Sequence, residues 1–269
     1  MDLELTGKRV LVTGSTSGIG VGIAELLAAE GAAVVIHGRD GGRGRAVADR
    51  LAGRGASVQL VCGDLATDAG AAEVAERAVS ALGGIDILVN NAGGSADVPN
   101  KSWFALGTSD WMVTYQRNVL AAVRLIHALV PPMRGRGWGR VINIATGAAL
   151  TPTSAQPDYG PAKAAMLNFS LGLSKAIAKS GVTSNCISPG MIRTEGLEQF
   201  LRHFATKRGW GDDLKQAEDY VASGSGQTVR RIGEVADIAY AVAFLASPRA
   251  DFINGTNLHI DGGITPSIT

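Results

Sequence analysis

Short apolar runs alternate with longer amphipathic stretches along most of this chain. Seven runs have the length and composition of buried strands: residues 10–13, 34–37, 58–62, 85–90, 140–144, 183–188 and 257–260. Apolar residues recur at helical spacing between them, in residues 18–29, 42–52, 66–81, 109–133, 159–179 and 235–246. Pro131 and Pro132, together with the glycine-rich residues 135–139, mark the end of one of these helices and not a domain boundary. Because strands that alternate with helices form parallel sheets covered on both faces, the pattern predicts a single doubly wound α/β domain over residues 1–269.

One segment departs from this rhythm. Residues 195–228 are more polar, contain Trp210 and Tyr220, and include two predicted helices at 197–207 and 212–221. The segment leaves the sixth predicted strand, and ligands of open α/β sheets lie beyond the carboxyl ends of the strands. Long insertions in compact domains are usually functional, so we expect a lid over a substrate. The alternative is a surface excursion without function.

Composition excludes several classes of protein. Apolar residues make up 46% of the 269 residues, and the net charge is +1 without a basic run, so no nucleic-acid partner is expected. No apolar stretch reaches the roughly 18 residues of a membrane span, and the acidic start of the chain is unlike a signal peptide. Cys62 and Cys186 are expected to be free thiols, and His37, His203 and His259 are too scattered for a metal site. These features predict a soluble, cytoplasmic protein.

A glycine-rich turn follows the first predicted strand. It consists of Gly14, Ser15, Thr16, Ser17, Gly18, Ile19 and Gly20, and an amphipathic helix continues from it. Small residues let the backbone approach a pyrophosphate, and the amino end of the helix supplies N–H groups and a positive dipole. The turn therefore predicts a dinucleotide site, although its glycine spacing differs from the standard fingerprint. The alternative is a tight turn that binds nothing.

Tyr159 and Lys163 stand one helical turn apart, so both side chains lie on the same helix face. A neighbouring ammonium stabilises a phenolate, so we expect the pKa of Tyr159 to fall from its ordinary value of about 10 toward neutrality. Such a phenol is a usable proton donor and acceptor. The spacing alone is weak evidence, because Tyr and Lys often meet at this separation by chance.

Taken together, the motifs resemble those of the short-chain dehydrogenase/reductase family over nearly the whole chain. They are T-G-x-x-x-G-I-G at 13–20, N-N-A-G at 90–93, Y-x-x-x-K at Tyr159 and Lys163, P-G at 189–190, and G-x-x-x-x-x-D-G-G at 255–263. The resemblance implies a Rossmann-like fold and reversible hydride transfer between NAD(P) and a small-molecule carbonyl or alcohol substrate, such as a 3-oxoacyl thioester or small ketone. The alternative is a non-catalytic dinucleotide-binding or scaffold protein that retains only the fold.

The resemblance also assigns catalytic roles. Tyr159 becomes the general acid of carbonyl reduction, and Lys163 lowers its pKa and holds the nicotinamide ribose. Thr146 stands where the family usually has serine; it keeps the hydroxyl donor but adds a methyl group that narrows the site. Asn118 falls on the family's proton-relay asparagine, whose side chain holds a water behind Lys163. The alternative for Asn118 is a helix-kink residue satisfied by the backbone.

Further residues match the family's cofactor contacts. Asp64 stands at the adenine contact and could instead be the N-cap of the next helix. Thr194 stands at the position that bonds the carboxamide or the pyrophosphate. The remaining cofactor-binding residues implied by the motifs are Leu65, Asn91, Ala92, Gly93, Pro189, Gly190 and Ile192.

The end of the second predicted strand indicates the choice of cofactor. The family's acidic position, which binds the ribose of NAD, is occupied by Gly38, and Arg39 follows it. A guanidinium without a carboxylate favours NADP(H), and Arg43 and Arg45 add further positive charge. Because Asp40 could reach the ribose instead, NAD(H) stays possible.

The family commonly assembles through two long helices, which correspond here to residues 121–128 and 164–171. Both segments carry small and apolar residues on more than one face, which suits burial against the core and a partner. We therefore expect a homo-oligomer, a homotetramer with two-fold axes. The alternative is that both faces are packed inside one subunit.

Overall fold

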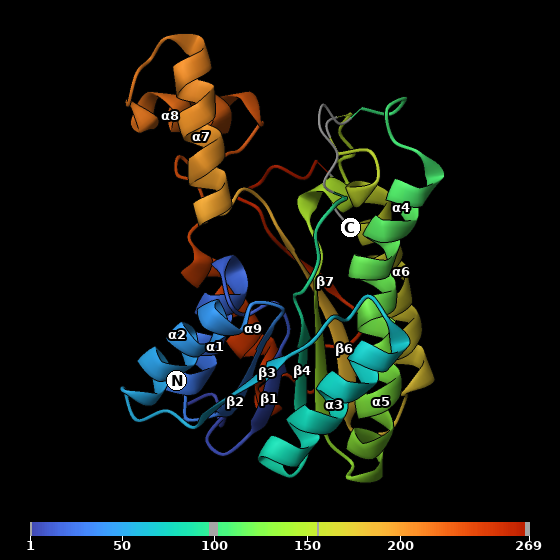
Figure 1. Ribbon diagram of the computed structural model, residues 1–269. Helices are drawn as coiled ribbons and strands as arrows, with labels where there is room; N and C mark the ends of the chain where they lie inside the picture. The colour runs from blue at the N-terminus through green and yellow to red at the C-terminus, as the bar shows by residue number, and fades with distance from the viewer. Residues whose placement is uncertain (1, 97–101, 155, 267–269) are drawn as a thin grey trace.

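The computed structural model describes residues 2–96, 102–154 and 156–266. A seven-stranded sheet, parallel throughout, runs through its centre in the order β3-β2-β1-β4-β5-β6-β7 (Figure 1). The strands are β1 (Arg9–Val12), β2 (Ala33–Gly38), β3 (Val58–Cys62), β4 (Ile87–Asn90), β5 (Gly139–Ile144), β6 (Val182–Pro189) and β7 (Asn257–Ile260). The order reverses between β1 and β4, which opens a crevice at their carboxyl ends, where ligands of such sheets bind. The predicted doubly wound parallel fold is confirmed.

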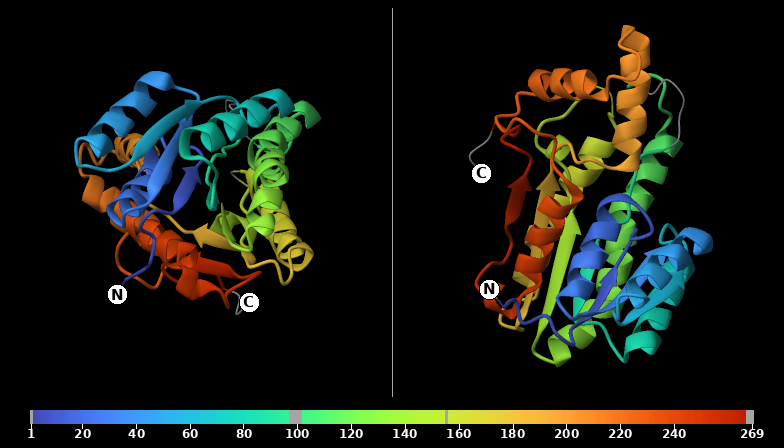
Figure 2. Two further views of the ribbon diagram at one scale, coloured as in Figure 1. Left: turned by 90° about the horizontal axis from the view of Figure 1, so that it is seen from below. Right: turned by 90° about the vertical axis from the view of Figure 1, so that its left-hand side faces the viewer.

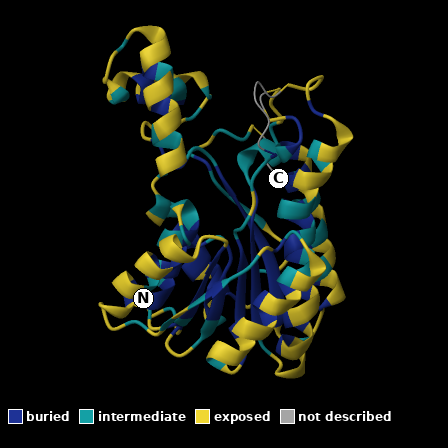
Figure 3. Ribbon diagram, in the orientation of Figure 1, coloured by how far each residue is buried: buried dark blue, intermediate teal, exposed yellow. Residues whose placement is uncertain are grey.

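Helices cover both faces of the sheet (Figure 2). On one face lie α1 (Gly18–Ala29), α2 (Gly41–Ala52) and α9 (Val235–Ala246), whose apolar residues share a core with the strands. On the other face, α3 (Asp68–Leu82), α5 (Ala121–Gly135) and α6 (Tyr159–Ala176) enclose a second core. Figure 3 shows the strands buried between these layers, with exposed residues on the outer sides of the helices. Within the described ranges, no helix combines the length and the apolar character needed to cross a membrane.

The predicted helix at 109–133 is divided into three pieces. It consists of α4 (Thr108–Tyr115), a π-helical turn (Gln116–Leu120) and α5. The helix end lies where the prolines and the glycine-rich residues 135–139 indicate it, because α5 contains Pro131 and Pro132 and ends at Gly135. Burial of neighbouring side chains on both sides of the prolines, Leu129, Val130 and Met133, holds this last turn against the core. The chain leaves the helix at Gly137, whose φ of 73° is left-handed.

The polar insertion after β6 forms two helices, as predicted. They are α7 (Glu195–Arg208) and α8 (Leu214–Gly224), and Figure 1 shows them in orange beyond the carboxyl ends of the strands. The pair has its own small apolar cluster, composed of Leu201, Ala205, Ala217 and Ile232. An aromatic group adds to it, in which Phe204, Trp210 and Tyr220 lie with ring centroids 5.5–5.8 Å apart. The insertion is therefore folded around its own contacts.

Candidate active site

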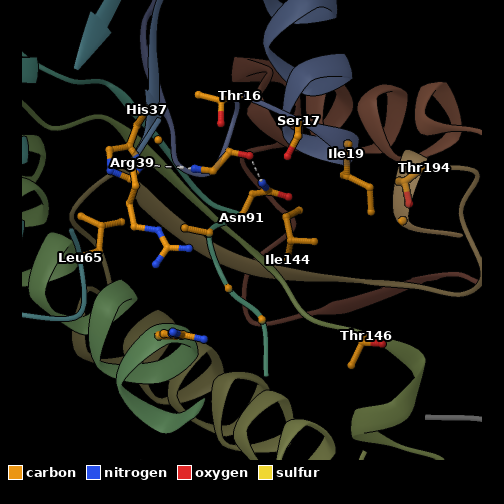
Figure 4. A pocket seen from close by; sticks show the side chains of 18 of the residues that line it. Thr16, Ser17, Ile19, His37, Arg39, Leu65, Asn91, Ile144, Thr146 and Thr194 are labelled. Carbon is orange, nitrogen blue, oxygen red and sulfur yellow. Dashed lines mark hydrogen bonds between the residues drawn. The ribbon is translucent and has the colours of Figure 1, made fainter. Parts of the chain in front are cut away.

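A cavity of about 720 Å³ lies at the carboxyl ends of the central strands (Figure 4). It brings together most of the residues that the motifs single out: Gly14, Thr16, Ser17, Gly18, Ile19, Arg39, Asp64, Leu65, Asn91, Ala92, Gly93, Thr146, Tyr159, Lys163, Pro189, Gly190 and Thr194. Four others do not line it: Ser15, Gly20, Asn118 and Ile192. The strand order explains this convergence, because each segment follows a strand that ends at this edge.

The glycine-rich turn is packed too closely for larger residues. Gly14 has a left-handed φ of 62°, and a Cβ atom there would lie 2.9 Å from the Cα of Ala92. A Cβ atom at Gly20 would lie 2.3 Å from the carbonyl oxygen of Gly14. Ser15 is fully buried, and its hydroxyl donates to the carbonyl of Val12 at 2.7 Å. Gly20 and Ser15 thus shape the turn from behind, while the other residues face the cavity.

Two side chains hold this turn in place from neighbouring strands. The Asn91 amide donates to the carbonyl oxygens of Thr13 and Gly14 at 2.9 and 3.0 Å. On β2, the Nδ1 atom of His37 accepts from the Gly14 amide at 3.3 Å, so the ring proton belongs on Nε2, which is 3.2 Å from the Gly63 carbonyl. Burial lowers the pKa of His37 to about 4, so the ring is neutral near pH 7. The sequence predicts only a packed or solvated His37, although the position of this residue at the end of a strand that neighbours the turn is a signal for this role.

The end of β2 presents guanidinium groups to the cavity. Arg39 and Arg43 both line it, and Figure 4 shows the Arg39 side chain extending into the space. A Cβ atom at Gly38 would lie 2.4 Å from the methyl carbon of Thr16, so a larger side chain does not fit there. Asp40 does not line the cavity; its carboxylate is the N-cap of α2 and accepts from the amides of Gly42 and Arg43. The end of β2 therefore contributes two guanidinium groups, those of Arg39 and Arg43, to the cavity lining.

Asp64, in the turn after β3, also lines the cavity. Its carboxylate accepts from the Ala66 amide at 3.1 Å within the turn before α3. The alternative interpretation of Asp64 as the helix N-cap was wrong, because Thr67 occupies that position and accepts from the Gly70 amide. Asp64 is therefore not used as a helix cap, and its carboxylate can accept a hydrogen bond from a ligand in the cavity.

Tyr159 and Lys163 lie on the first turns of α6 and face the cavity together. The Nζ atom of Lys163 is 5.8 Å from the centroid of the Tyr159 ring, and it donates to the carbonyl of Ile144 at 2.7 Å. Burial lowers the pKa of Lys163 to about 8 and raises that of Tyr159 to about 12. The expected fall in the pKa of Tyr159 is therefore contradicted, because burial away from water disfavours the charged phenolate. Tyr159 is a fully protonated phenol near pH 7.

A short 3₁₀ turn positions Thr146 in the same cavity as Tyr159 and Lys163. Thr146 is the N-cap of that turn (Gly147–Ala149), and its hydroxyl oxygen accepts from the Ala148 amide at 3.3 Å. Gly160 lets α6 approach the turn, since a Cβ atom there would lie 2.8 Å from the Ala148 carbonyl oxygen. Thr146 and Tyr159 consequently line the same cavity.

Asn118 lies behind the cavity, inside the π-helical turn. Its amide nitrogen donates to the carbonyls of Gly94 and Thr114, both at 2.7 Å, and its oxygen accepts from the Gly94 amide at 3.1 Å. Such turns need a side chain to satisfy the freed backbone groups, as the kink interpretation expects. A Cβ atom at Gly93 would lie 2.4 Å from the Asn118 oxygen and 3.3 Å from the Nζ of Lys163. Asn118 and Lys163 therefore flank Gly93 from two directions.

Several residues that line the cavity were not anticipated as site residues. They are His37, Arg117, Glu195, Gly196 and Gln199, together with residues that neighbour the predicted ones in the chain. Three of these belong to the first turns of α7, so the insertion contributes directly to the cavity wall. Helical periodicity alone could not identify them, because it does not say which face of a separate helix turns toward the sheet.

Known proteins with nicotinamide cofactors are similar to this chain over nearly its whole length. A family model described as enoyl-(acyl carrier protein) reductase matches residues 14–265. The L-sorbose reductase of Gluconobacter frateurii, solved with NADPH and L-sorbose, is 35% identical over the full length of both chains with a TM-score of 0.94. A 3-oxoacyl (acyl-carrier-protein) reductase of Agrobacterium tumefaciens, solved with NADP bound, is 32% identical with a TM-score of 0.85 and covers 97% of this chain and 96% of its own.

A reductase of known type is also similar to this chain in sequence. The 3-oxoacyl-(acyl-carrier-protein) reductase of Haemophilus influenzae is 34% identical over 261 residues, which are 97% of this chain and 99% of the relative. Matches of this length cover the cofactor turn, the Tyr159–Lys163 pair and the last strand together. The chain belongs to the short-chain dehydrogenase/reductase family and is a nicotinamide-dependent oxidoreductase that interconverts carbonyl and alcohol groups.

Proposed function

We propose that this enzyme uses NADPH to reduce a small polar ketone, with Tyr159 as the general acid. NADPH held by the glycine-rich turn and Arg39 would supply the hydride that adds to the carbonyl carbon. Tyr159 donates its phenolic proton to the carbonyl oxygen, and the Thr146 hydroxyl donates a hydrogen bond to the same oxygen. Lys163 lies beneath Tyr159 and favours the phenolate that forms, which solvent then reprotonates.

The cationic end of the cavity supports NADPH over NADH. Arg39 and Arg43 line it, Gly38 leaves no room for an acidic side chain, and the Asp40 carboxylate already caps α2. A 2′-phosphate next to Arg39 forms a charge-assisted pair, which no group of NADH can replace. This arrangement is the single observation on which the cofactor assignment depends. Structural relatives that were solved with NADPH or NADP agree with it.

Arg39→Ala tests the cofactor assignment. We expect the Kd for NADPH to rise by roughly 10- to 100-fold, the loss of about 1.5–3 kcal/mol that accompanies a charge-assisted hydrogen bond. The Kd for NADH should change by less than about threefold on the same argument. Titration of both cofactors by fluorescence measures this, with Arg45→Ala as the control, since Arg45 is exposed and does not line the cavity. An unchanged ratio of the two Kd values would contradict the assignment.

The polar residues of the cavity lining support a hydroxylated substrate. Thr146 of the 3₁₀ turn and Thr194, Glu195 and Gln199 at the start of α7 all line the cavity, and they carry hydroxyl, carboxylate and amide groups. Such groups hydrogen-bond to a polyol, whereas the acyl chain of a 3-oxoacyl thioester needs apolar walls. The L-sorbose reductase relative was solved with a ketose of this class. We therefore place a small ketose ahead of a 3-oxoacyl thioester.

A substrate panel decides between these classes. NADPH oxidation is followed with L-sorbose, related ketoses and an acetoacetyl thioester, and each measurement is repeated with NADH. The proposal expects the highest kcat/KM for a ketose with NADPH. A higher value for the thioester would move the substrate class to acyl reduction, and no turnover with any ketone would favour a non-catalytic protein.

We further infer that the α7–α8 insertion acts as a lid and that the enzyme works in the cytoplasm as a homotetramer. The lid is supported by Glu195, Gly196 and Gln199, which line the cavity from α7. The location is supported by Cys62 and Cys186, which are both free thiols. The tetramer rests on the faces of α5 and α6 and is tested below.

A further inference from the structure

The α7–α8 insertion begins and ends at one point of the backbone. The Arg193 amide donates to the Gly233 carbonyl at 2.7 Å, and the Gly233 amide donates to the Met191 carbonyl at 3.0 Å. Ile192 and Gly233 form an isolated parallel bridge at the same place. The two ends of the segment between these residues therefore lie side by side. Contacts at these two ends determine the direction in which α7 and α8 extend from the enzyme.

The side chain of Arg193 joins the insertion to the body of the enzyme. Its Nε atom donates to Glu234 at 3.1 Å, and one terminal nitrogen donates to Glu218 at 2.7 Å. Glu218 belongs to α8 and is only 9% exposed, so its carboxylate depends on this partner for compensation of its burial. Glu234 is the N-cap residue of α9, which is packed into the core against α1. The planar fork of one guanidinium thus links a lid helix to a fixed helix.

The residues that directly follow Arg193 form part of the cavity wall. Thr194, next to Arg193, lines the cavity and caps α7 by accepting from the Leu197 amide at 3.3 Å. The residues of α7 that line the cavity follow within the next turn and a half: Glu195, Gly196 and Gln199. Arg193 itself is not part of the lining. Because Arg193 directly precedes the cap residue of α7, its grip on α8 bears on where α7 enters the cavity.

We infer that Arg193 is a positioning residue that holds the α7–α8 lid over the cavity through Glu218 and Glu234, and so sets substrate and cofactor affinity without touching either. The inference rests on the proposed function only in that the cavity binds a dinucleotide and a ketone. Loss of the Arg193 contacts should therefore change the binding of substrate and cofactor and not the chemical step. The reason is that the groups around Tyr159 are held by β5, α6 and the 3₁₀ turn and not by the insertion.

Kinetics of Arg193 variants give the first test. In Arg193→Met the KM for the ketone should rise about tenfold, while kcat stays within about threefold, because a charge-assisted link is lost far from the reacting atoms. The KM of Arg193→Lys should lie between those of the wild type and Arg193→Met. An ammonium group can pair with one of the two carboxylates, but it lacks the planar guanidinium that binds both. Glu218→Gln should act in the same direction, and the double variant should be no worse than Arg193→Met alone.

A matched control lies at the other end of α9. Arg249 forms a pair with Glu4 at 2.8 Å, and both side chains are about half exposed. Arg249→Met removes a comparable arginine from the surface without contact to the insertion, so its KM values should equal those of the wild type. An unchanged KM in Arg193→Met, or a fall in kcat alone, would overturn the inference.

Limited proteolysis gives a second test that needs no turnover. Exposed trypsin sites lie on the insertion at Arg202, Lys207, Arg208 and Lys215. At saturating NADPH, Arg193→Met should be cleaved there about tenfold faster than the wild type, in proportion to the larger population of the open lid. Equal cleavage rates would overturn the positioning role even if the substrate proposal fails. Failure of the substrate proposal alone would leave the difference in cleavage intact.

Discussion

At the scale of single residues, burial decides the chemistry of the catalytic pair. The neighbouring Lys163 suggests a lowered pKa for Tyr159, yet the pKa of Tyr159 rises to about 12 and that of Lys163 falls to about 8. The reason is that both side chains leave water when α6 packs on β5, and each charged form loses its hydration. Residue types and spacing identified the pair from the sequence. They could not give the balance between solvation and charge, which depends on packing.

Thr146 provides a residue-scale prediction. Thr146→Ser should retain activity, whereas Thr146→Val should lower kcat/KM by roughly 10²- to 10³-fold, because the hydroxyl and not the methyl group donates to the developing oxyanion. Steady-state kinetics with the best ketone of the panel measure both variants. Valine has nearly the same shape as threonine, so equal activity of Thr146→Val would remove the position from the mechanism.

At the scale of elements, the interruption of one helix could not be read from periodicity. The apolar pattern predicts a continuous helix over 109–133, and the structure inserts a π-helical turn at Gln116–Leu120. One extra residue in a turn hardly disturbs the apolar pattern on either side. It does place Asn118 against the loop at Gly94, where its amide satisfies backbone groups. The water-holding role of Asn118 stays a prediction.

His37 links two elements, since it joins β2 to the turn after β1. Its pKa falls from an ordinary 6.5 to about 4 on folding, so the unfolded chain binds the proton more readily. The stabilising contribution is complete above pH 6.5 and is lost as the pH falls from 6.5 toward 4. Urea unfolding between pH 7.5 and 4.5 should therefore show a steeper loss of stability for the wild type than for His37→Gln. Parallel curves would contradict this account of the turn.

At the scale of the whole molecule, the sequence predicted the fold closely. Apolar runs such as 10–13 and 34–37 became neighbouring buried strands, because strands covered on both faces need continuous apolar residues. The motifs after the strands met in one cavity for the same topological reason. Residues of α7 that line the cavity were missed, since their place depends on how the insertion leaves its base at Ile192 and Gly233.

The assembly is also a property at this scale. Residues 121–128 and 164–171 became parts of α5 and α6, whose inner faces are buried, while Leu171 on α6 is 44% exposed. We expect a homotetramer in which such outer faces pair across two-fold axes. Light scattering at micromolar concentration should give four times the mass of the 27.7 kDa chain. A stable monomer with full activity would contradict the prediction.

The turnover of Tyr159→Phe tests the central claim most directly. Removal of one hydroxyl leaves the ring, the cavity and the cofactor turn unchanged, so the Kd for NADPH should stay within about threefold, the size of a marginal contact. Turnover of the best ketone should fall by about 10²- to 10⁴-fold, the usual contribution of a general acid. Turnover within a few-fold of the wild type, at unchanged NADPH affinity, would show that Tyr159 is not the proton donor.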